Sequence, residues 1–353
     1  MPDEFNADML DLARGARGLT QAEVAQAAHV SQAMLSKVEN RLLPPSAELA
    51  ERLADALHFP VEFFFQSERA LGFPHYHHRK RASLGSKALS RVHAIINIRR
   101  LHISRLLKSY ESGTAKPVPA IDLDEKEISP ADAARMVREY WLLPRGPVEN
   151  VTDTIETAGG IVVLAAFGTP ALDGISFRAA GLPPIFVMNR DVSADRYRFS
   201  LAHELGHMVM HCMPGDDDDK MERQADEFAA AFLMPPVEIK PHLVPPAIDK
   251  FARAKPHWKV SIKAMIRRAK ELNLISPDDY RRLSISYSKA GYSRSEPFPL
   301  ARETPTALAR MVEFHTKDLR YSTTEISKLL MLREDDFAAM YGPKRRLELV
   351  VSR

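Results

Sequence analysis

The segment HELGH at 203–207 combines two histidines and a glutamate at a spacing that suits a metal site. It lies within RFSLAHELGHMVMH, which is compatible with a helix over its whole length. Residues four apart lie on one face of a helix, so His203 and His207 can direct their imidazoles at one Zn²⁺ ion. Glu204 can then take a proton from a water molecule that the zinc ion activates. The segment therefore predicts metal-assisted hydrolysis.

A catalytic zinc site needs a third protein ligand, and the segment ERQADEFA at 222–229 supplies the candidate. We expect this segment to form the next helix, packed antiparallel after an acidic loop. Glu222 is the predicted third ligand, with Asp219 and Glu227 as nearby rivals. Asp226 lies four residues beyond Glu222, on the same helical face, and we expect it to accept the free ring N–H of a ligand histidine.

Other reactive side chains near this segment have simpler interpretations. His211 lies one turn beyond the histidine pair, and we favour a packed residue behind the ligands over a fourth ligand or a substrate contact. The acidic run 216–219 is expected to be a solvated loop, and we assign no role to Cys212 or to the histidines within 75–78. Tyr197, Arg178 and His211 are unranked candidates for stabilising an oxyanion.

The stretch LTQAEVAQAAHVSQAMLSKVENR at 19–41 has the pattern of a helix-turn-helix. Thr20 and Glu23 are spaced as a capping box, and Ser31 begins a second helix after a short turn. The N-terminal side chains of such a second helix contact base edges in the major groove. Gln32 suits adenine, and Lys37 suits guanine or a phosphate. The candidate DNA-contacting residues are Gln21, Ser31, Gln32, Ala33, Ser36, Lys37, Asn40 and Arg41. The alternative is a helical bundle without a nucleic-acid role.

The stretch 70–110 is rich in Lys and Arg and contains no Asp or Glu. Its second half, from Ser86 to Tyr110, is predicted to be an amphipathic helix with a cationic outer face. Such a face either adds nonspecific phosphate contacts or is simply solvated between domains, and the sequence leaves both interpretations open.

The remaining pattern predicts a multidomain protein. Five short helices are expected before residue 66, and strands at 161–165 and 184–188 with helices at 194–211 and 221–233 indicate an α+β domain. Further helices are expected from Ser129-Pro130 through Val137, from Pro147 to about Gly159, and at 261–272, 306–315, 322–331 and 334–341. The predicted domains are a helix-turn-helix domain at 1–66, a basic helical linker at 67–120, a zincin-like domain at 121–240 and a helical C-terminal region at 241–353.

The composition fits a globular cytoplasmic protein. Hydrophobic residues make up 45% and the net charge is only +3. A single cysteine excludes a disulfide within the chain and fits a reducing compartment. No stretch approaches the roughly 20 apolar residues of a membrane span, and the acidic start is unlike a secretion signal. We therefore expect no membrane association.

Two regions resemble known families. Residues 9–66 resemble the XRE family (Cro/C1-type helix-turn-helix) on the stretch at 19–41. Residues 121–240 resemble the ImmA/IrrE metallopeptidase family on RFSLAHELGHMVMH and ERQADEFAAAFLMP, preceded by PPIFVMN. This resemblance implies a gluzincin-like endopeptidase in which His203, His207 and Glu222 bind Zn²⁺ and Glu204 is the catalytic acid/base. It also implies a double-stranded DNA operator, a homodimer, and a protein substrate that is an XRE-type repressor or the chain itself.

These features favour a DNA-binding transcriptional regulator that carries a zinc-dependent endopeptidase domain. One alternative is a regulator or antitoxin whose metallopeptidase-like domain is a catalytically idle sensor. Another is a dedicated protease that uses DNA only for localisation. The intact HExxH pattern favours a working site over an idle one.

Overall fold

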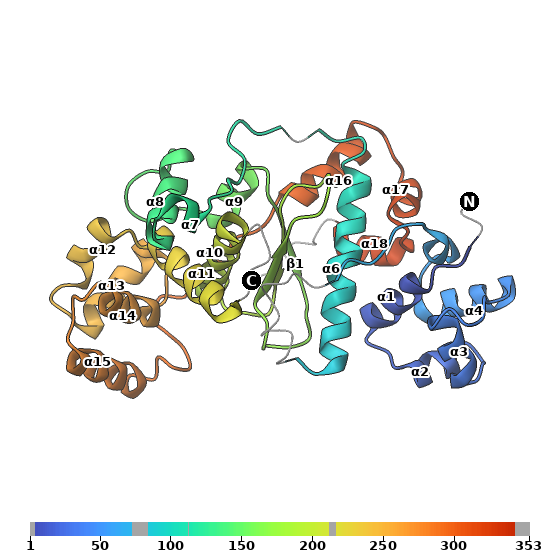
Figure 1. Cartoon of the computed structure of the whole chain (residues 1–353), viewed down its shortest axis with the longest axis horizontal. Coiled ribbons are helices and arrows are strands. Elements are labelled where there is room, and N and C mark those ends of the chain that lie inside the picture. The colour runs from blue at the N-terminus through green and yellow to red at the C-terminus, as the bar shows by residue number, and fades with distance from the viewer. Residues whose placement is uncertain (1–3, 73–83, 112, 212–216, 343–353) are drawn as a thin grey trace, which may run out of the picture. The chain divides into compact units, whose positions relative to one another are not determined.

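The computed structural model describes residues 4–72, 84–111, 113–211 and 217–342, which form two compact units (Figure 1). The first unit is drawn from 1–72, 86–111 and 308–353, and the second from 73–85 and 112–307. The predicted fold class is confirmed: both ends of the chain are helical, and a small mixed sheet with helices lies between them. His75, His77, His78, Cys212 and Asp216, which the sequence analysis considered, lie outside the described residues.

The N-terminal helices begin where the sequence places their caps. They are α1 (Ala7–Arg17), α2 (Gln21–Ala27), α3 (Gln32–Glu39), α4 (Ala47–Leu57) and the 3₁₀ turn η1 (Val61–Phe65). The Ser31 hydroxyl accepts the Met34 N–H, and Thr20 and Glu23 form the predicted capping box. Helix α1 ends at Arg17, before Gly18 in the left-handed conformation.

The second half of the basic stretch forms a long helix, α6 (Ser86–Leu106), that packs against α1 (Figure 1). The two helices approach closely at Gly15, where an added Cβ would lie 2.7 Å from the Ser90 hydroxyl oxygen. Ala94, Ile98 and Leu101 of α6 belong to the core of the N-terminal helices. The predicted cationic outer face is interrupted, because Arg105 is buried and donates to Gln66.

Three C-terminal helices complete the first unit. They are α16 (Ala307–Lys317), whose first residue is assigned to the second unit, α17 (Thr323–Leu330) and α18 (Glu334–Tyr341). Helix α18 contacts the N-terminal helices through an Arg17–Asp336 ion pair and a 2.7 Å contact between His58 Nε2 and Asp335. The four predicted domain ranges stay a prediction. The first compact unit contains α6, α17, α18 and most of α16 together with the N-terminal helices.

The second unit is built on a three-stranded sheet with the order β1–β3–β2. Strand β1 (Ile161–Ala165) pairs parallel with β3 (Ile185–Asn189), which pairs antiparallel with β2 (Gly174–Phe177). The sequence analysis found β1 and, within one residue, β3. It missed β2, which is only four residues long and follows a segment rich in turn-forming residues.

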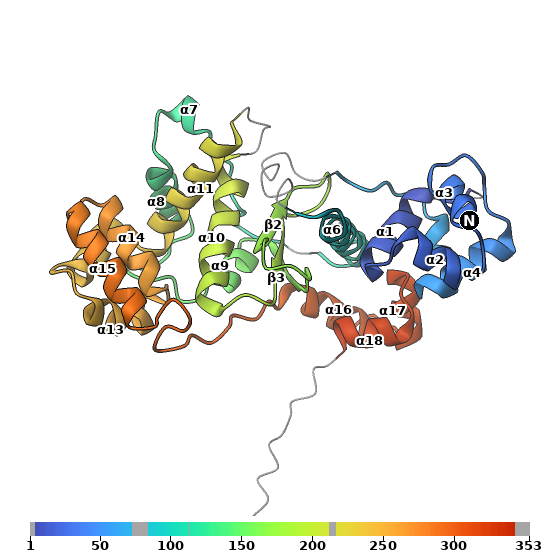
Figure 2. The ribbon, with the colours of Figure 1, turned by 90° about the horizontal axis from the view of Figure 1, so that it is seen from below.

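Helices cover this sheet and extend away from it. Before the sheet come α7 (Leu123–Lys126), α8 (Pro130–Tyr140) and α9 (Val151–Thr157). Helix α9 begins four residues after the predicted Pro147 because Asn150 caps it. Helices α10 (Ala194–Met210) and α11 (Asp218–Leu233) lie side by side, with α10 next to the sheet and α11 between α10 and α8 (Figure 2). Then follow α12 (Pro236–Leu243), α13 (Ile248–Trp258), α14 (Ile262–Glu271) and α15 (Pro277–Lys289), of which only α14 was predicted.

Candidate metal centre and nucleic-acid surface

The HExxH segment lies near the C-terminal end of α10, where α10 and α11 pack closely. A Cβ added to Gly206 would lie 3.3 Å from the Ala225 Cα and 3.1 Å from the Phe228 ring, so a larger residue would push the helices apart. This close packing places the first turns of α11 against the histidines of α10. The C-terminal carbonyls of α10 are also held, because Arg178 donates to Met208 O at 3.2 Å and the Ile121 N–H donates to Val209 O at 2.8 Å.

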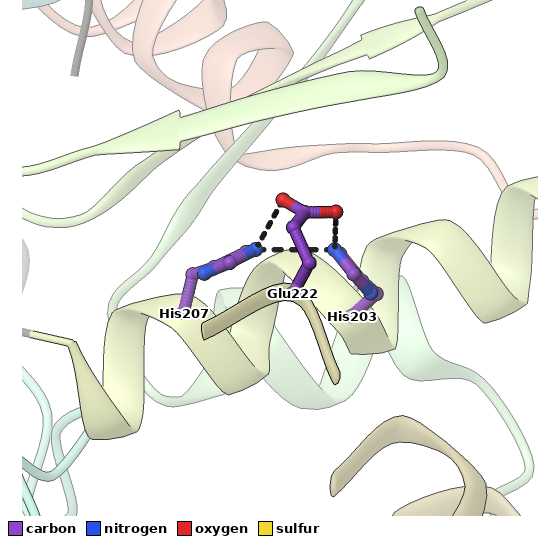
Figure 3. Close-up of side chains that lie close together, drawn as sticks. All are labelled: His203, His207 and Glu222. Carbon is purple, nitrogen blue, oxygen red and sulfur yellow. Dashed lines mark hydrogen bonds and ion pairs between the residues drawn. The ribbon is translucent and has the colours of Figure 1, made fainter. Parts of the chain in front are cut away.

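His203, His207 and Glu222 converge on one point (Figure 3). The two Nε2 atoms lie 3.1 Å apart, and the Glu222 carboxylate oxygens lie 3.5 Å from Nε2 of His203 and 3.3 Å from Nε2 of His207. Zinc ligands at 2.0–2.1 Å in tetrahedral geometry are separated by about 3.3 Å from one another. The observed separations therefore fit a zinc ion, which histidine and carboxylate ligands suit. His207 is fully buried and the Glu222 side chain is 23% exposed.

The ring nitrogen of His203 that faces away from this point contacts Asp226. Its Nδ1–H donates to Asp226 Oδ1 at 2.9 Å, which leaves the Nε2 lone pair for a metal ion. Arg267 of α14 donates to the other oxygen of Asp226 at 3.0 Å. Burial raises the pKa of Asp226, but its contacts with His203 and Arg267 outweigh burial and hold the pKa below the usual value. Asp226 therefore lies where the sequence analysis expected it, with an arginine partner that the sequence did not reveal.

His207 is held by a second chain of contacts. Its Nδ1 lies 2.9 Å from Nδ1 of His211, and Nε2 of His211 lies 2.9 Å from Oε1 of Gln224. Burial lowers the pKa of His211, which favours the neutral ring. With Gln224 accepting from Nε2–H, a neutral His211 accepts the Nδ1–H of His207, and this again leaves the Nε2 lone pair of His207 for a metal ion. His211 thus lies behind a ligand histidine and outside the converging group.

Glu204 is buried and turned toward the edge strand β2. Its Oε2 accepts the Ser176 N–H at 2.9 Å and the Ser176 hydroxyl at 2.7 Å. Strand β2 comes this close because Gly174 has no side chain: an added Cβ would lie 2.4 Å from Met188 Sδ and 3.5 Å from Glu204 Cγ. Sequence analysis missed Ser176, since nothing in its spacing connects it to the HExxH segment.

The remaining candidates lie elsewhere. Asp219 and Glu227, the rivals of Glu222, are exposed and fall outside the converging group. The Tyr197 hydroxyl contacts Thr152 at 2.8 Å in the interior, and burial raises its pKa to about 12. A second group with metal-ligand spacing, His58 with Asp335 and Asp336, is partly exposed, and its Asp336 is already paired with Arg17.

The candidate DNA surface is the outer face of α3. Ser31, Gln32, Ala33 and Lys37 are exposed, whereas Leu35 and Val38 face the core. No hydrogen bond or ion pair within the described residues involves the Gln32 or Lys37 side chain, so both remain available to a ligand. The face carries the predicted residues in the predicted orientation, and their contact with DNA stays a prediction.

The flanking candidates are already engaged within the protein. Gln21 donates to Glu39 at 2.5 Å, and Glu39 also pairs with Arg14 at 2.6 Å. Arg41 pairs with Asp8, and Asn40 donates to the Ser36 carbonyl at 2.8 Å. A phosphate contact from Gln21 or Arg41 therefore has to replace an internal contact.

Comparison with protein families matches both regions. Residues 7–62 match the family model of a helix-turn-helix domain. Residues 156–270 match that of the IrrE N-terminal-like domain, which is a peptidase family. The second match continues past residue 240 through α14. A comparison with curated proteins finds no match to the chain.

None of the described helices combines the length and apolar character that a membrane span requires. The predicted fusion is confirmed by the two matches, and the second family implies a divalent metal. The chain thus joins a region similar to helix-turn-helix domains, at 7–62, to a region similar to the IrrE N-terminal-like domain, at 156–270.

Proposed function

We propose that the chain is a DNA-binding transcriptional regulator whose second unit is a zinc-dependent endopeptidase that cleaves a regulator protein or the chain itself. The observation that carries the enzymatic part is the convergence of two imidazole nitrogens and a carboxylate, with mutual separations of 3.1 to 3.5 Å. The helix-turn-helix match and the exposed polar face of α3 support the DNA-binding part.

Each residue of the metal centre has a separate role in the proposed hydrolysis. His203, His207 and Glu222 would hold the zinc ion, and Asp226 and His211 orient the two rings. When bound, the ion supplies Lewis acidity, which polarises a peptide carbonyl and makes a water molecule more acidic. Glu204 takes a proton from the attacking water as general base, and Ser176 fixes the orientation of its carboxylate.

The DNA-binding part uses a different kind of surface. Gln32 and Lys37 project from the first two turns of α3, where a recognition helix contacts base edges. Gln32 has the paired donor and acceptor that adenine requires, and Lys37 provides a charge for guanine or a phosphate.

The experiment that tests the enzymatic part compares the zinc-loaded wild type with Glu204→Gln. Both proteins are incubated with helix-turn-helix repressors encoded beside the gene, and fragments are identified by mass spectrometry. We expect cleavage by the wild type, cleavage reduced at least about 100-fold in Glu204→Gln, and equal zinc content in the two proteins. Undiminished cleavage in the variant would rule out Glu204 as the base. Zinc binding without cleavage of any repressor or of the chain would favour the idle sensor domain.

A further inference from the structure

A cavity of about 600 Å³ lies beside the N-terminal half of α10 and the C-terminal end of α11. On α10, Arg196 and Ser200 line the cavity and lie seven and three residues before His203, so the three share a helical face. On α11, Ala230 lines the cavity and lies four residues after Asp226. The cavity is within the size range of ligand sites and shares Arg267 with the surroundings of the candidate metal centre.

Arg267 joins the cavity to the metal centre. It lines the cavity and donates to Asp226 at 3.0 Å, while Asp226 contacts the ring of His203 at 2.9 Å. A group bound in the cavity therefore lies about two side chains from a ligand histidine. This distance suits a neighbouring residue of the peptide that the metal centre cleaves.

The cavity carries more positive charge than its own acids neutralise. Every carboxylate in its wall already has a cationic partner: Asp173 pairs with Arg196, Asp195 and Glu296 pair with Lys255, and Glu271 pairs with Arg267. Lys263 and Arg294 also line the cavity, and neither side chain forms an ion pair with any part of the chain that the structure describes. Because Lys255 is shared by two carboxylates, the wall has a net charge of about +1, and the exposed Lys263 and Arg294 side chains can contact a ligand.

The chemistry of the wall favours a short acidic side chain over a purely ionic ligand. Phe199, Tyr292 and Met234 supply apolar surface for methylene groups, and Ser293 and Ser295 lie beside Arg294. The Glu296 carboxylate shows that this region already accommodates one buried acid, which accepts from Lys255 at 2.8 Å and from the Ile262 N–H at 2.9 Å.

We propose that this cavity is a substrate subsite that receives a glutamate or aspartate side chain of the peptide cleaved at the metal centre, with Lys263 and Arg294 as its recognition residues. The proposal rests on the proposed peptidase function, because it assigns the cavity to the substrate of that site. A charge-assisted contact of this kind contributes about tenfold in affinity.

The test measures binding without cleavage. Fluorescein-labelled heptapeptides of alanine and serine with one central Glu, Gln or Lys are titrated by fluorescence anisotropy into the zinc-loaded full chain carrying Glu204→Gln. We expect the Glu peptide to bind about tenfold more tightly than the Gln peptide, and the Lys peptide to bind least. Lys263→Glu with Arg294→Glu should remove the preference for Glu. Arg253→Glu, an exposed charge reversal on α13 outside the cavity, should keep it.

The outcomes separate this proposal from the peptidase function. Equal binding of the Glu and Gln peptides, no measurable binding of the Glu peptide, or a preference that survives the double reversal overturns the subsite. Circular dichroism checks folding, and Lys263→Gln with Arg294→Gln provides a milder variant that must also lose the preference. A preference for Glu in a chain that cleaves nothing supports the subsite while the peptidase proposal fails. If the chain cleaves substrates that have no acidic residue at a fixed distance from the cleaved bond, the subsite proposal fails and the peptidase proposal stands.

Discussion

The recognition face of α3 and the HExxH turn of α10 present polar side chains in opposite ways. Gln32 and Lys37 are exposed and make no internal polar contact within the described residues, whereas His207 and Glu204 are almost completely buried. Buried groups of the metal centre are held by neighbours from other elements: Ser176 on β2 contacts Glu204, and Asp226 on α11 contacts His203. The side chains on α3 are free to adjust to a ligand, whereas those of the metal centre are already fixed by contacts within the protein.

This difference determines what a substitution can reveal. In the metal centre, a buried polar group that loses its partner destabilises the fold or misplaces a catalytic atom. On α3, the loss of an exposed side chain leaves folding unchanged and affects only the complex with DNA. The following substitutions test whether this contrast holds.

The largest effect is expected for Arg198→Met, which removes a buried cation from α10. Arg198 is 2% exposed, pairs with Glu303 and donates to Val148 O at 2.6 Å. The change leaves Glu303 as a buried charge without its cation, so the free energy of unfolding should fall by about 3–5 kcal/mol. Urea denaturation measures this loss. The control is Arg196→Met, a half-exposed position on the same helix, which should cost less than about 1 kcal/mol. An equal loss of unfolding free energy in the two variants would mean that burial does not determine the cost of removing an arginine from α10.

Ser176→Ala tests whether the metal centre depends on the neighbours that hold it. Without the hydroxyl, Glu204 loses the 2.7 Å contact with Ser176 Oγ and keeps the contact with the Ser176 N–H, so its carboxylate is less well oriented. We expect kcat to fall about 10- to 100-fold, with zinc content and KM nearly unchanged. Ser284→Ala on α15, which removes a hydroxyl that donates to the Tyr280 carbonyl at 2.8 Å, should leave kcat unaltered. An unchanged kcat in Ser176→Ala would show that Ser176 has no positioning role.

Gln32→Ala and Lys37→Ala test the exposed surface. Each should weaken binding to DNA selected from a random pool by about 1–3 kcal/mol if it contacts a base. Electrophoretic mobility shifts give the affinities, and thermal unfolding should be the same as for the wild type. Gln26→Ala, an exposed change on α2, serves as the control. Unchanged affinity in both variants would move the DNA-contacting surface away from α3.

The smallest effect is expected for Asp335→Asn, at the exposed contact between α18 and the N-terminal helices. A hydrogen bond from His58 lowers the pKa of Asp335, so the contact stabilises the fold above the unfolded pKa and is lost as the pH falls through the folded value. The variant should therefore melt slightly below the wild type at pH 5, and the gap should close below about pH 4. A difference in melting temperature that grows as the pH falls would contradict this prediction.

The same contrast explains how much could be predicted from the sequence. Local signals sufficed for the capped helices: Thr20, Ser31 and Ser322 each begin a helix through a bond within three residues. The histidine pair also lies within one helix, so its spacing carried the prediction. Glu222 required only the next helix along the chain.

What the sequence did not reveal depends on contacts between distant segments. Ser176 reaches Glu204 across 28 residues, and Arg267 reaches Asp226 across 41. Helix α6 looked like a basic linker because its cations were visible, while its apolar residues that pack on α1 were read as one side of an isolated helix. Helices α12 and α13 each contain an internal proline, which disfavours a helix locally, and tertiary packing outweighs that preference.

The central claim is that His203, His207 and Glu222 form one metal site, and zinc content tests it most directly. Full-length protein is stripped with a chelator, reloaded with zinc, dialysed and analysed by plasma mass spectrometry. We predict one zinc ion per chain in the wild type and less than a tenth of that in His203→Ala with His207→Ala, about the effect of losing two of three ligands. DNA binding should persist in the double variant. Full zinc occupancy without the two imidazoles would contradict the account.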